Sequence, residues 1–284
     1  MNGLILEGGA RRCMFTAGVV DCFMDNFINF DYVAGVSAGA QIAVNYLSGQ
    51  RGRSKSVIMP NNDNSSGFIK SKLSFDLNKM AYEYPYKQFP FDFNSFFNSN
   101  AICEIVATEC NSGKAEYFRE TGDEYLLLKK LCASCSLPLV YPMVKIGNGE
   151  YLDGSITDSI PFERAFSVGC DKLIVVLAKP IEESATDYSK IKFIVQKKYG
   201  TDYPILVETL INRFGSYQEQ CKKLYEYEKA GKIFIIRPLR TNVKTFELSK
   251  ENLENAYTAG YNVAQTDMSE ILDFLAVNRV YNEM

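Results

Sequence analysis

Histidine is absent from this chain of 284 residues. The absence excludes a Ser-His-Asp triad, in which an imidazole takes the proton from the serine hydroxyl. It also removes a common protein ligand for zinc. A hydrolytic enzyme with this sequence needs another base, and carboxylate, lysine and tyrosine side chains are the groups that remain.

Cysteine is too sparse for a disulfide scaffold, since eight cysteines are spread over the whole chain. Several lie inside apolar patterns, where a reduced thiol packs as a small hydrophobic side chain. The one close pair, Cys132 and Cys135, has no second pair to complete a zinc site, and core packing is the expected role ahead of a redox function. We therefore expect no metal and a reducing, cytoplasmic location.

Positive charge and long apolar runs are also scarce. The net charge is -3 and the isoelectric point is near 5.3. The one basic cluster, residues 49–56, is short, so we expect no nucleic-acid partner. The first residues lack a positively charged region, and their apolar run is shorter than a signal peptide needs. No later stretch has the length expected of a membrane span.

What the sequence does contain is an alternation of apolar strands and helices, over a chain long enough for one large domain. The patterns predict a strand at 2–6, a helix at 13–27, a strand at 30–35 and a helix at 38–49. Further strands are predicted at 101–110, 114–118, 171–178 and 233–238, a hairpin at 145–155 with Asn148 and Gly149 at its tip, and helices at 123–137, 160–170, 203–231 and 249–275. This order favours a mainly parallel sheet covered by helices on both faces, within a single domain 1–284.

Residues 50–100 interrupt this alternation. They are polar to about residue 67 and aromatic through 82–97, so we expect a flexible loop followed by an aromatic cap segment. The aromatic side chains could line a groove, cover it as a lid or belong to the core. The residues from about 200 onward are expected to form a helical C-terminal extension of the same domain.

Ser37 lies at the centre of Gly35-Val36-Ser37-Ala38-Gly39, a match to the GxSxG pattern. The match follows an apolar strand and opens an Ala-rich helix, as the sharp turn of a nucleophilic serine requires. The alternative is a tight strand-to-helix turn in which small residues only permit close packing.

A second glycine turn, "LEGGARRC" at 6–13, connects the first strand and helix. Such a turn can direct backbone N–H groups at a negative oxygen and so form an oxyanion hole. It could equally hold a phosphate or merely make the turn. A nucleophile one strand-helix unit further on favours the oxyanion hole.

Asp153 precedes Gly154 after a short strand. An aspartate before a glycine is ordinarily a hairpin or helix-cap residue. Because the chain has no histidine, Asp153 also becomes a candidate proton acceptor for Ser37.

These motifs, in this order, resemble the patatin-like phospholipase family, particularly its bacterial cytoplasmic members. The resemblance spans roughly residues 3 to 178 and is carried by the glycine loop at 7–12, the Ser37 turn, Pro138 with Tyr141-Pro142, and Asp153-Gly154. "FIIRP" at 234–238 and the C-terminal helices also look like those relatives.

Membership would imply a three-layer α/β/α fold and a Ser-Asp dyad, with Ser37 as nucleophile and Asp153 as base. It implies no cofactor and a lipid-like ester as substrate, with transient contact at a membrane surface. Backbone donors of the oxyanion hole map onto Gly8, Gly9, Ala10 and Arg11.

The chain departs from the family pattern at Ala10 and Cys13, where the family usually has glycine. If either position requires a positive φ, a side chain there is strained and the oxyanion hole changes shape. Ser155 also replaces the usual Gly or Ala after Asp153-Gly154. Arg12 keeps the family's arginine position, where it could bind an acidic head group of the substrate or pair with Glu7 or Asp21.

The sequence therefore predicts a cytoplasmic serine acyl hydrolase acting on a lipid-like ester. One alternative is a non-catalytic lipid-binding or scaffolding protein that kept the fold after its oxyanion loop decayed. A third, a nucleotide- or phosphate-binding protein using Gly8 and Gly9, lacks a Walker lysine and a full GxGxxG pattern.

Overall fold

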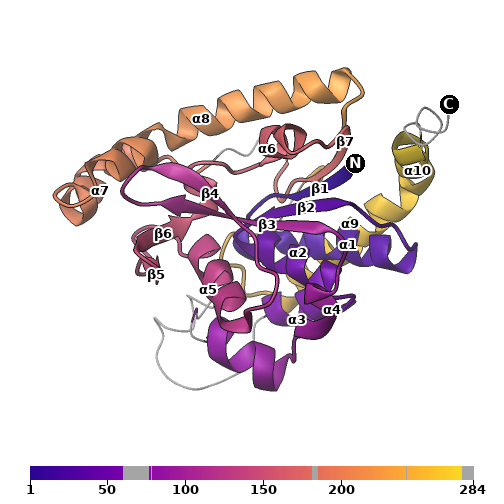
Figure 1. Cartoon of the computed structure of the whole chain (residues 1–284). Coiled ribbons are helices and arrows are strands. Elements are labelled where there is room, and N and C mark those ends of the chain that lie inside the picture. The colour runs from indigo at the N-terminus through magenta and orange to yellow at the C-terminus, as the bar shows by residue number, and fades with distance from the viewer. Residues whose placement is uncertain (60–76, 78, 181–184, 241, 277–284) are drawn as a thin grey trace.

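A sheet runs through the middle of the molecule, with helices on both faces (Figure 1). The computed structural model describes residues 1–59, 77, 79–180, 185–240 and 242–276. Within these residues eight strands form the sheet: β1 (Asn2–Leu6), β2 (Tyr32–Val36), β3 (Ile102–Glu109), β4 (Lys114–Phe118), β5 (Val144–Ile146), β6 (Gly149–Asp153), β7 (Lys172–Val176) and β8 (Ile233–Ile236). Neighbours in the series β3, β2, β1, β7, β8 are parallel, and β4, β5 and β6 add antiparallel pairs. The predicted three-layer, mainly parallel architecture is confirmed.

The helices are α1 (Met14–Asp25), α2 (Ala38–Leu47), α3 (Arg53–Ile58), α4 (Phe93–Phe97), α5 (Glu124–Ser134), α6 (Phe162–Ser167), α7 (Lys192–Tyr199), α8 (Pro204–Lys229), α9 (Lys250–Thr266) and α10 (Met268–Ala276). Shorter helical segments are η1 (Ala10–Cys13), η2 (Lys79–Gln88), η3 (Gly154–Ile156) and η4 (Tyr188–Ile191). No described helix is both long enough and apolar enough to cross a membrane.

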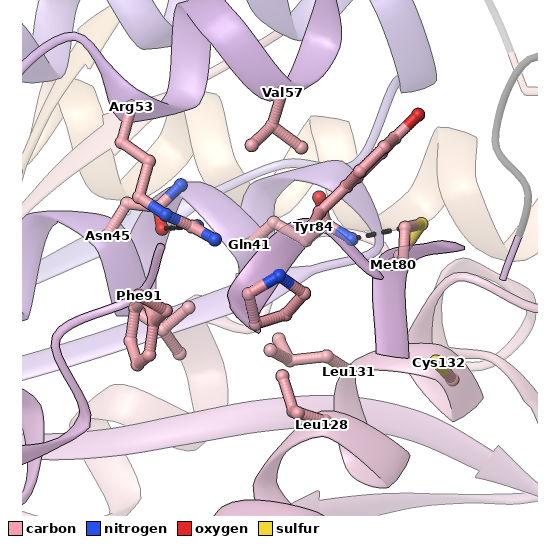
Figure 2. Close-up of a pocket in the computed structure, with 12 residues that line it drawn as sticks. Gln41, Asn45, Arg53, Val57, Met80, Tyr84, Phe91, Leu128, Leu131 and Cys132 are labelled. Carbon is pink, nitrogen blue, oxygen red and sulfur yellow. Dashed lines mark hydrogen bonds between the residues drawn. The ribbon is translucent and has the colours of Figure 1, made fainter. Parts of the chain in front are cut away.

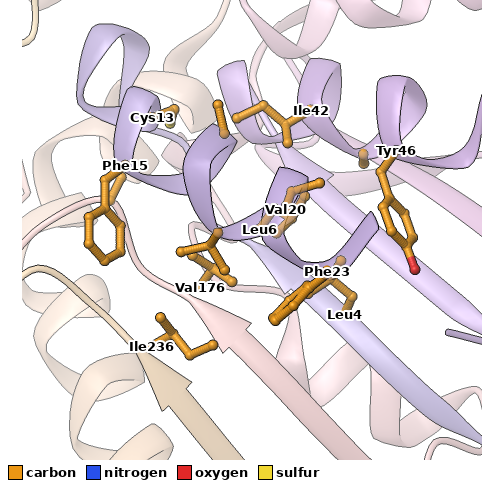
Figure 3. Packing of buried hydrophobic residues seen from close by; sticks show 14 of the residues in the cluster. Leu4, Leu6, Cys13, Phe15, Val20, Phe23, Ile42, Tyr46, Val176 and Ile236 are labelled. Carbon is orange, nitrogen blue, oxygen red and sulfur yellow. The ribbon is translucent and has the colours of Figure 1, made fainter. Parts of the chain in front are cut away.

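Side-chain alternation along the strands divides the core between the two faces of the sheet. Leu4 and Leu6 of β1 pack on the face covered by α1, α2 and α9, whereas Ile5 packs on the face covered by α6 and α8. Figure 3 shows Leu4 and Leu6 together with Val20 and Phe23 of α1. All of these side chains are essentially fully buried, and burial of each contributes about 1.5–3 kcal/mol before entropy is counted.

Two glycines allow α9 to pack closely against α1. A Cβ atom on Gly18 would lie 2.0 Å from the carbonyl oxygen of Tyr257, and a Cβ on Gly260 would lie 2.0 Å from that of Phe15. The helices therefore touch backbone to backbone, which no larger residue permits. This contact joins the C-terminal helices to the first helix of the chain.

Most predicted elements are present, but the segment at 50–100 differs from the expectation. Where an irregular polar loop was predicted, the described residues include the helix α3, and the aromatic stretch contains η2 and α4. The predicted loop residues 60–67 lie outside the described part of the chain. Phe91 and Phe96 are buried against α2 and α5, so part of the aromatic segment is core.

Two local predictions were wrong, and one helix was missed. The hairpin pairs Ile146 with Gly149, so its two-residue turn is Gly147-Asn148, with Gly147 at φ +57°. The C-terminal helix is broken at Asp267 into α9 and α10. The helix α7 was not predicted, because its residues "KFIVQKKY" bury only Val195 and Tyr199 and show no apolar stripe.

The glycine contact between α1 and α9 can be tested by substitution to alanine. Gly18→Ala and Gly260→Ala should each lower the free energy of unfolding by at least about 2 kcal/mol, because the new methyl group meets backbone that cannot move aside. Chemical denaturation measures the change.

The matched control is Gly215→Ala in α8, where a Cβ atom would meet nothing within 4 Å. This substitution should raise the free energy of unfolding by about 0.5–1 kcal/mol, because alanine favours the helix. If all three variants gain stability, the two helices do not depend on close backbone contact.

Candidate active site

Ser37 lies in the turn between β2 and α2, at the carboxyl end of the strand. Its backbone has φ +55° and ψ -125°, a conformation that costs a non-glycine residue about 1–3 kcal/mol. Close packing holds it there, because a Cβ on Gly35 would lie 2.5 Å from Ala40 Cα and one on Gly39 would lie 2.4 Å from the Leu6 carbonyl oxygen. The Ser37 N–H donates to Ser134 Oγ at 2.8 Å. The two motif glycines therefore serve packing as well as the turn.

The register of β3 brings Asp153 to Ser37. Strand β2 pairs with β3 as far as Val36 opposite Val106, and β6 pairs with the same strand from Asp153 opposite Ala107. Strand β4 overlaps both pairings, so β2 and β6 must share the other edge of β3. They meet there end to end, which places the residues that follow β2 beside the last residue of β6.

Asp153 is completely buried. Its Oδ1 accepts the Ser155 N–H at 2.9 Å, whereas its Oδ2 has no hydrogen-bond partner of ordinary geometry among the described residues. Burial raises the pKa of this carboxyl group, and hydrogen bonding from Ser155 and from the Ser37 side chain opposes the rise. The arrangement leaves one carboxylate oxygen near the Ser37 hydroxyl.

The glycine loop lies against the same turn. A Cβ on Gly8 would lie 2.9 Å from the Val36 carbonyl oxygen and 3.0 Å from Ser37 Cβ, so the backbone approaches the serine more closely than any side chain would allow. Among the described residues, no backbone hydrogen bond is made by the N–H of Gly8, Gly9 or Ala10. These three groups, in a loop that lies against Ser37, remain as donors for a ligand oxygen.

Arg11 differs from the other three predicted donors. Its N–H donates to the Thr245 carbonyl at 3.3 Å, and its buried guanidinium donates to the Glu247 carbonyl. Both groups are directed at the segment before α9. Arg11 therefore connects the loop to the C-terminal part of the chain in this structure.

The two departures from the family pattern have different consequences. Ala10 has φ +50°, so a side chain stands at a position that favours glycine. Cys13 has φ -66° and needs no glycine. The expected strain is present at the first position and absent at the second.

A cavity of about 90 Å³ opens beside Ser37 and Asp153. Three cationic side chains line it: Arg12, Lys179 and Arg213. Lys179 pairs with the buried Glu7 at 2.9 Å and lies over the Tyr217 ring at 4.0 Å. Glu7 also accepts hydrogen bonds from the Tyr217 hydroxyl and the Ala178 N–H.

The sequence offered Glu7 or Asp21 as a partner of Arg12, but in the structure both acids have other partners. Glu7 binds Lys179, and Asp21 accepts from the Gly52 N–H and the Tyr257 hydroxyl. Arg12 is one of the residues that line the cavity.

Arg213 was not identified from the sequence. Its guanidinium donates to the Ser155 carbonyl at 2.7 Å, to Ser155 Oγ at 3.2 Å and to the Thr186 carbonyl at 3.3 Å. It therefore fixes the turn that carries Asp153, and its charge partly offsets the rise that burial causes in the pKa of that carboxyl group. The available signal was its place on the buried stripe of α8 with Leu210 and Tyr217, where a charged residue is unusual.

A second, narrow cavity lies further along α2 (Figure 2). Gln41, one turn beyond Ser37, contacts Met80 Sδ and Cys135 Sγ. Beyond Gln41 the walls are mainly apolar, with Val44 from α2 and Leu128 and Leu131 from α5. The aromatic segment contributes Tyr84, Pro85 and Phe91, so it lines a cavity as well as joining the core.

No metal centre or reactive thiol accompanies this site in the described part of the chain. There, no group of three or more His, Cys, Asp or Glu side chains lies close enough to hold a metal ion. All eight cysteines are free thiols. Burial raises the pKa of Cys132 to about 12 and that of Cys135 well above its ordinary value, which disfavours the reactive thiolate.

Comparison with known proteins shows similarity to two family models, to a curated protein and to a solved structure. A model described as patatin-like phospholipase matches residues 4–166, and one for a domain of unknown function (DUF6363) matches residues 203–276. The Escherichia coli (strain K12) protein named "Uncharacterized protein YjjU" is 31% identical over 187 residues, which are 62% of this chain and 52% of that protein. The chain thus spans about half the length of this curated relative.

A solved structure, VipD from Legionella pneumophila, is similar in fold. The TM-score is 0.54 at 13% identity, and the match covers 95% of this chain and 67% of that one.

The strain at Ala10 predicts the effect of restoring glycine. Ala10→Gly should raise the free energy of unfolding by about 0.5–1 kcal/mol, because relief of left-handed strain exceeds the added entropy of the unfolded chain. Ester turnover should change less than about threefold, since the loop already has its shape. Denaturant titration and initial rates measure both.

Cys13→Gly is the companion variant. Its free energy of unfolding should fall by about 1–3 kcal/mol, because the substitution removes a buried side chain without relieving backbone strain. A large gain in turnover from Ala10→Gly would show instead that the alanine narrows the oxyanion site.

Proposed function

Because the chain belongs to the patatin-like phospholipase family, we propose that it is a serine acyl hydrolase that cleaves lipid esters with a Ser37-Asp153 dyad. The observation that carries this proposal is that two energetically unfavourable features lie side by side. Ser37 is held in a strained turn, and beside it a buried carboxylate keeps one oxygen without an ordinary hydrogen bond. Such strain and desolvation are typical of catalytic groups.

The proposed reaction begins with attack of Ser37 Oγ on the ester carbonyl carbon. Asp153 Oδ2 takes the hydroxyl proton as the bond forms, and the carbonyl oxygen becomes an oxyanion that accepts from the N–H groups of Gly8, Gly9 and Ala10. The intermediate collapses, and the leaving alkoxide takes the proton from Asp153. Water then repeats the sequence on the acyl-enzyme, which releases the acid and restores the Ser37 hydroxyl.

Arg213 acts in this scheme as a positioning residue. Its bonds to Ser155 and Thr186 hold the turn of the base, while Ser155 N–H holds Asp153 Oδ1. The second oxygen is thereby turned toward the serine. Burial raises the pKa of Asp153, which strengthens the carboxylate as a base.

The cavity at Ser37 is lined by the polar side chains of Arg12, Lys179 and Arg213. Their N–H groups suit the oxygen atoms of an ester head group. Arg12 is the proposed head-group ligand. The apolar cavity beyond Gln41 has a volume of about 30 Å³, which is too small for an acyl chain.

We also propose that the described helices after residue 200 belong to the same domain as the Ser37 site. The first family model ends at residue 166 and the second begins at residue 203. Arg213 nevertheless bonds to Ser155 in the turn after Asp153, and the Tyr217 hydroxyl donates to Glu7 beside the glycine loop. The free thiols favour a reducing compartment, and we place the protein in the cytoplasm.

The nucleophile is tested by covalent labelling. A fluorophosphonate should form a single adduct with the wild-type chain and none with Ser37→Ala, because only a serine with a base and oxyanion donors is activated. Intact-mass spectrometry detects the adduct. The matched control is Ser159→Ala, which removes another buried serine and should be labelled like the wild type.

Labelling that persists in Ser37→Ala contradicts the assignment. A folded wild-type chain that is never labelled would favour the non-catalytic lipid-binding alternative.

The base is tested by the pH dependence of kcat/KM on a soluble neutral ester. The rate should rise with pH along one acidic limb, with an apparent pKa above the ordinary aspartate value of about 3.9, since burial raises the pKa of Asp153. Asp153→Asn should lose at least about a hundredfold in kcat, as expected for loss of a general base.

The same variant should unfold at a higher denaturant concentration at neutral pH. Because the pKa of Asp153 is higher in the folded state, its ionisation destabilises the fold once the pH rises past the ordinary aspartate pKa. Asparagine does not ionise, so the variant avoids this loss of stability. Asp158→Asn is the control, because burial also raises the pKa of Asp158 but Tyr117 and Gln220 hold its carboxylate. An acidic limb that persists in Asp153→Asn would exclude this residue as the base.

A further inference from the structure

Helix α7 presents apolar side chains to the solvent. Only Val195 and Tyr199 are buried, in the core cluster that contains Leu206 and Leu210. Phe193 is 80% exposed and Ile194 is 52% exposed. Exposed large apolar side chains that adjoin one another mark an interaction surface.

Lysines surround these side chains. Residues 188–201 contain four lysines and no acidic residue. Within α7, Lys197 follows Phe193 by four positions and Lys198 follows Ile194 by four, so each apolar side chain has a lysine one turn away on its own side. We call this set the α7 surface; it consists of Lys190, Ile191, Lys192, Phe193, Ile194, Lys197 and Lys198.

Most of this positive charge is available for a partner. In the described part of the chain, Lys190 lies 3.6 Å from Asp187 while remaining 78% exposed, and Lys192, Lys197 and Lys198 make no ion pair. Lysine is depleted at protein interfaces. A helix with bulky apolar side chains among lysines instead fits the boundary between anionic head groups and acyl chains.

The α7 surface follows directly on a wall of the active-site cavity. Ala185 and Thr186 line the cavity with Ser37 and Asp153, and the Thr186 carbonyl is held by Arg213. The chain reaches Lys190 four residues later. In Figure 1, α7 lies at the end of the molecule opposite the N-terminus, where β1 begins.

We propose that the α7 surface docks the protein on bilayers that contain anionic lipid. Phe193 and Ile194 enter the interfacial region, and the lysines contact the head groups. This proposal names a partner for the proposed lipid hydrolase and rests on that function only for its biological purpose, because the docking itself requires no catalysis.

Vesicle cosedimentation of the full chain tests the docking. The wild type should bind vesicles of phosphatidylcholine and phosphatidylserine, bind vesicles of phosphatidylcholine alone weakly, and lose binding at high salt. Lys197→Gln with Lys198→Gln should weaken binding about thirtyfold, since each lysine near an anionic surface contributes severalfold. Phe193→Ser with Ile194→Ser should weaken it at least about tenfold.

Two controls remove the same kinds of side chain elsewhere. Lys222→Gln with Lys229→Gln neutralises two exposed lysines of α8. Phe27→Ser removes a phenylalanine that is 87% exposed and shares a groove with Met1, at the start of β1. Both control proteins should bind vesicles as the wild type does.

Soluble measurements separate this proposal from the proposed function. The α7 variants should keep wild-type turnover of a soluble ester and wild-type fluorophosphonate labelling, and Ser37→Ala should still bind vesicles. If the wild type ignores phosphatidylserine vesicles, or the α7 variants bind them normally, the docking proposal is overturned. It is also overturned if Phe193→Ser only abolishes self-association, which would assign the surface to a protein contact.

Discussion

The edge of β3 is the constraint on which the site depends. A strand edge offers one row of backbone donors and acceptors, and here two strands divide that row between them, β2 as far as Val106 and β6 from Ala107. Because they approach from opposite directions, their ends must meet. The turn after β2 carries Ser37, and the last residue of β6 is Asp153. Gly154 permits the junction, since a Cβ there would lie 2.2 Å from the Val106 carbonyl oxygen.

Several features of this junction are energetically unfavourable, and interactions elsewhere in the fold offset them. Ser37 and Ala10 occupy left-handed backbone conformations, and Asp153 is a buried carboxylate that lacks a full set of hydrogen bonds. Backbone packing at Gly35 and Gly39 holds the serine, and Arg213 holds the turn of the acid. The buried pair of Glu7 and Lys179, with the Tyr217 hydroxyl, secures the first strand against α8. Residues far apart in the chain thus maintain a geometry that no local preference would select.

The C-terminal helices contribute to the site as well as to the core. Helix α8 supplies Arg213 and Tyr217, and Arg11 of the glycine loop bonds to the segment before α9. Helix α9 then packs against α1 through Gly18 and Gly260. The part of the chain matched by the second family model therefore supports the loop and turns of the first. Helix α7 lies just before that part of the chain, and the segment that leads to it contributes Ala185 and Thr186 to the cavity at Ser37.

The sequence by itself determined the alternation of strands and helices, the layered parallel sheet and the identity of Ser37, Asp153 and the glycine loop as candidates, because these depend on periodicity and on short motifs. It could not place Arg213 or Lys179, which act through contacts between residues far apart in the chain, nor pair Glu7 correctly. It missed α7, since a helix that buries two side chains and exposes apolar ones has no ordinary amphipathic pattern. It also posed the question of strain at Ala10 and Cys13 without answering it, because φ is set by how the loop packs on β2. Tertiary structure decided these points, since burial, pairing and backbone conformation are properties of the assembled fold.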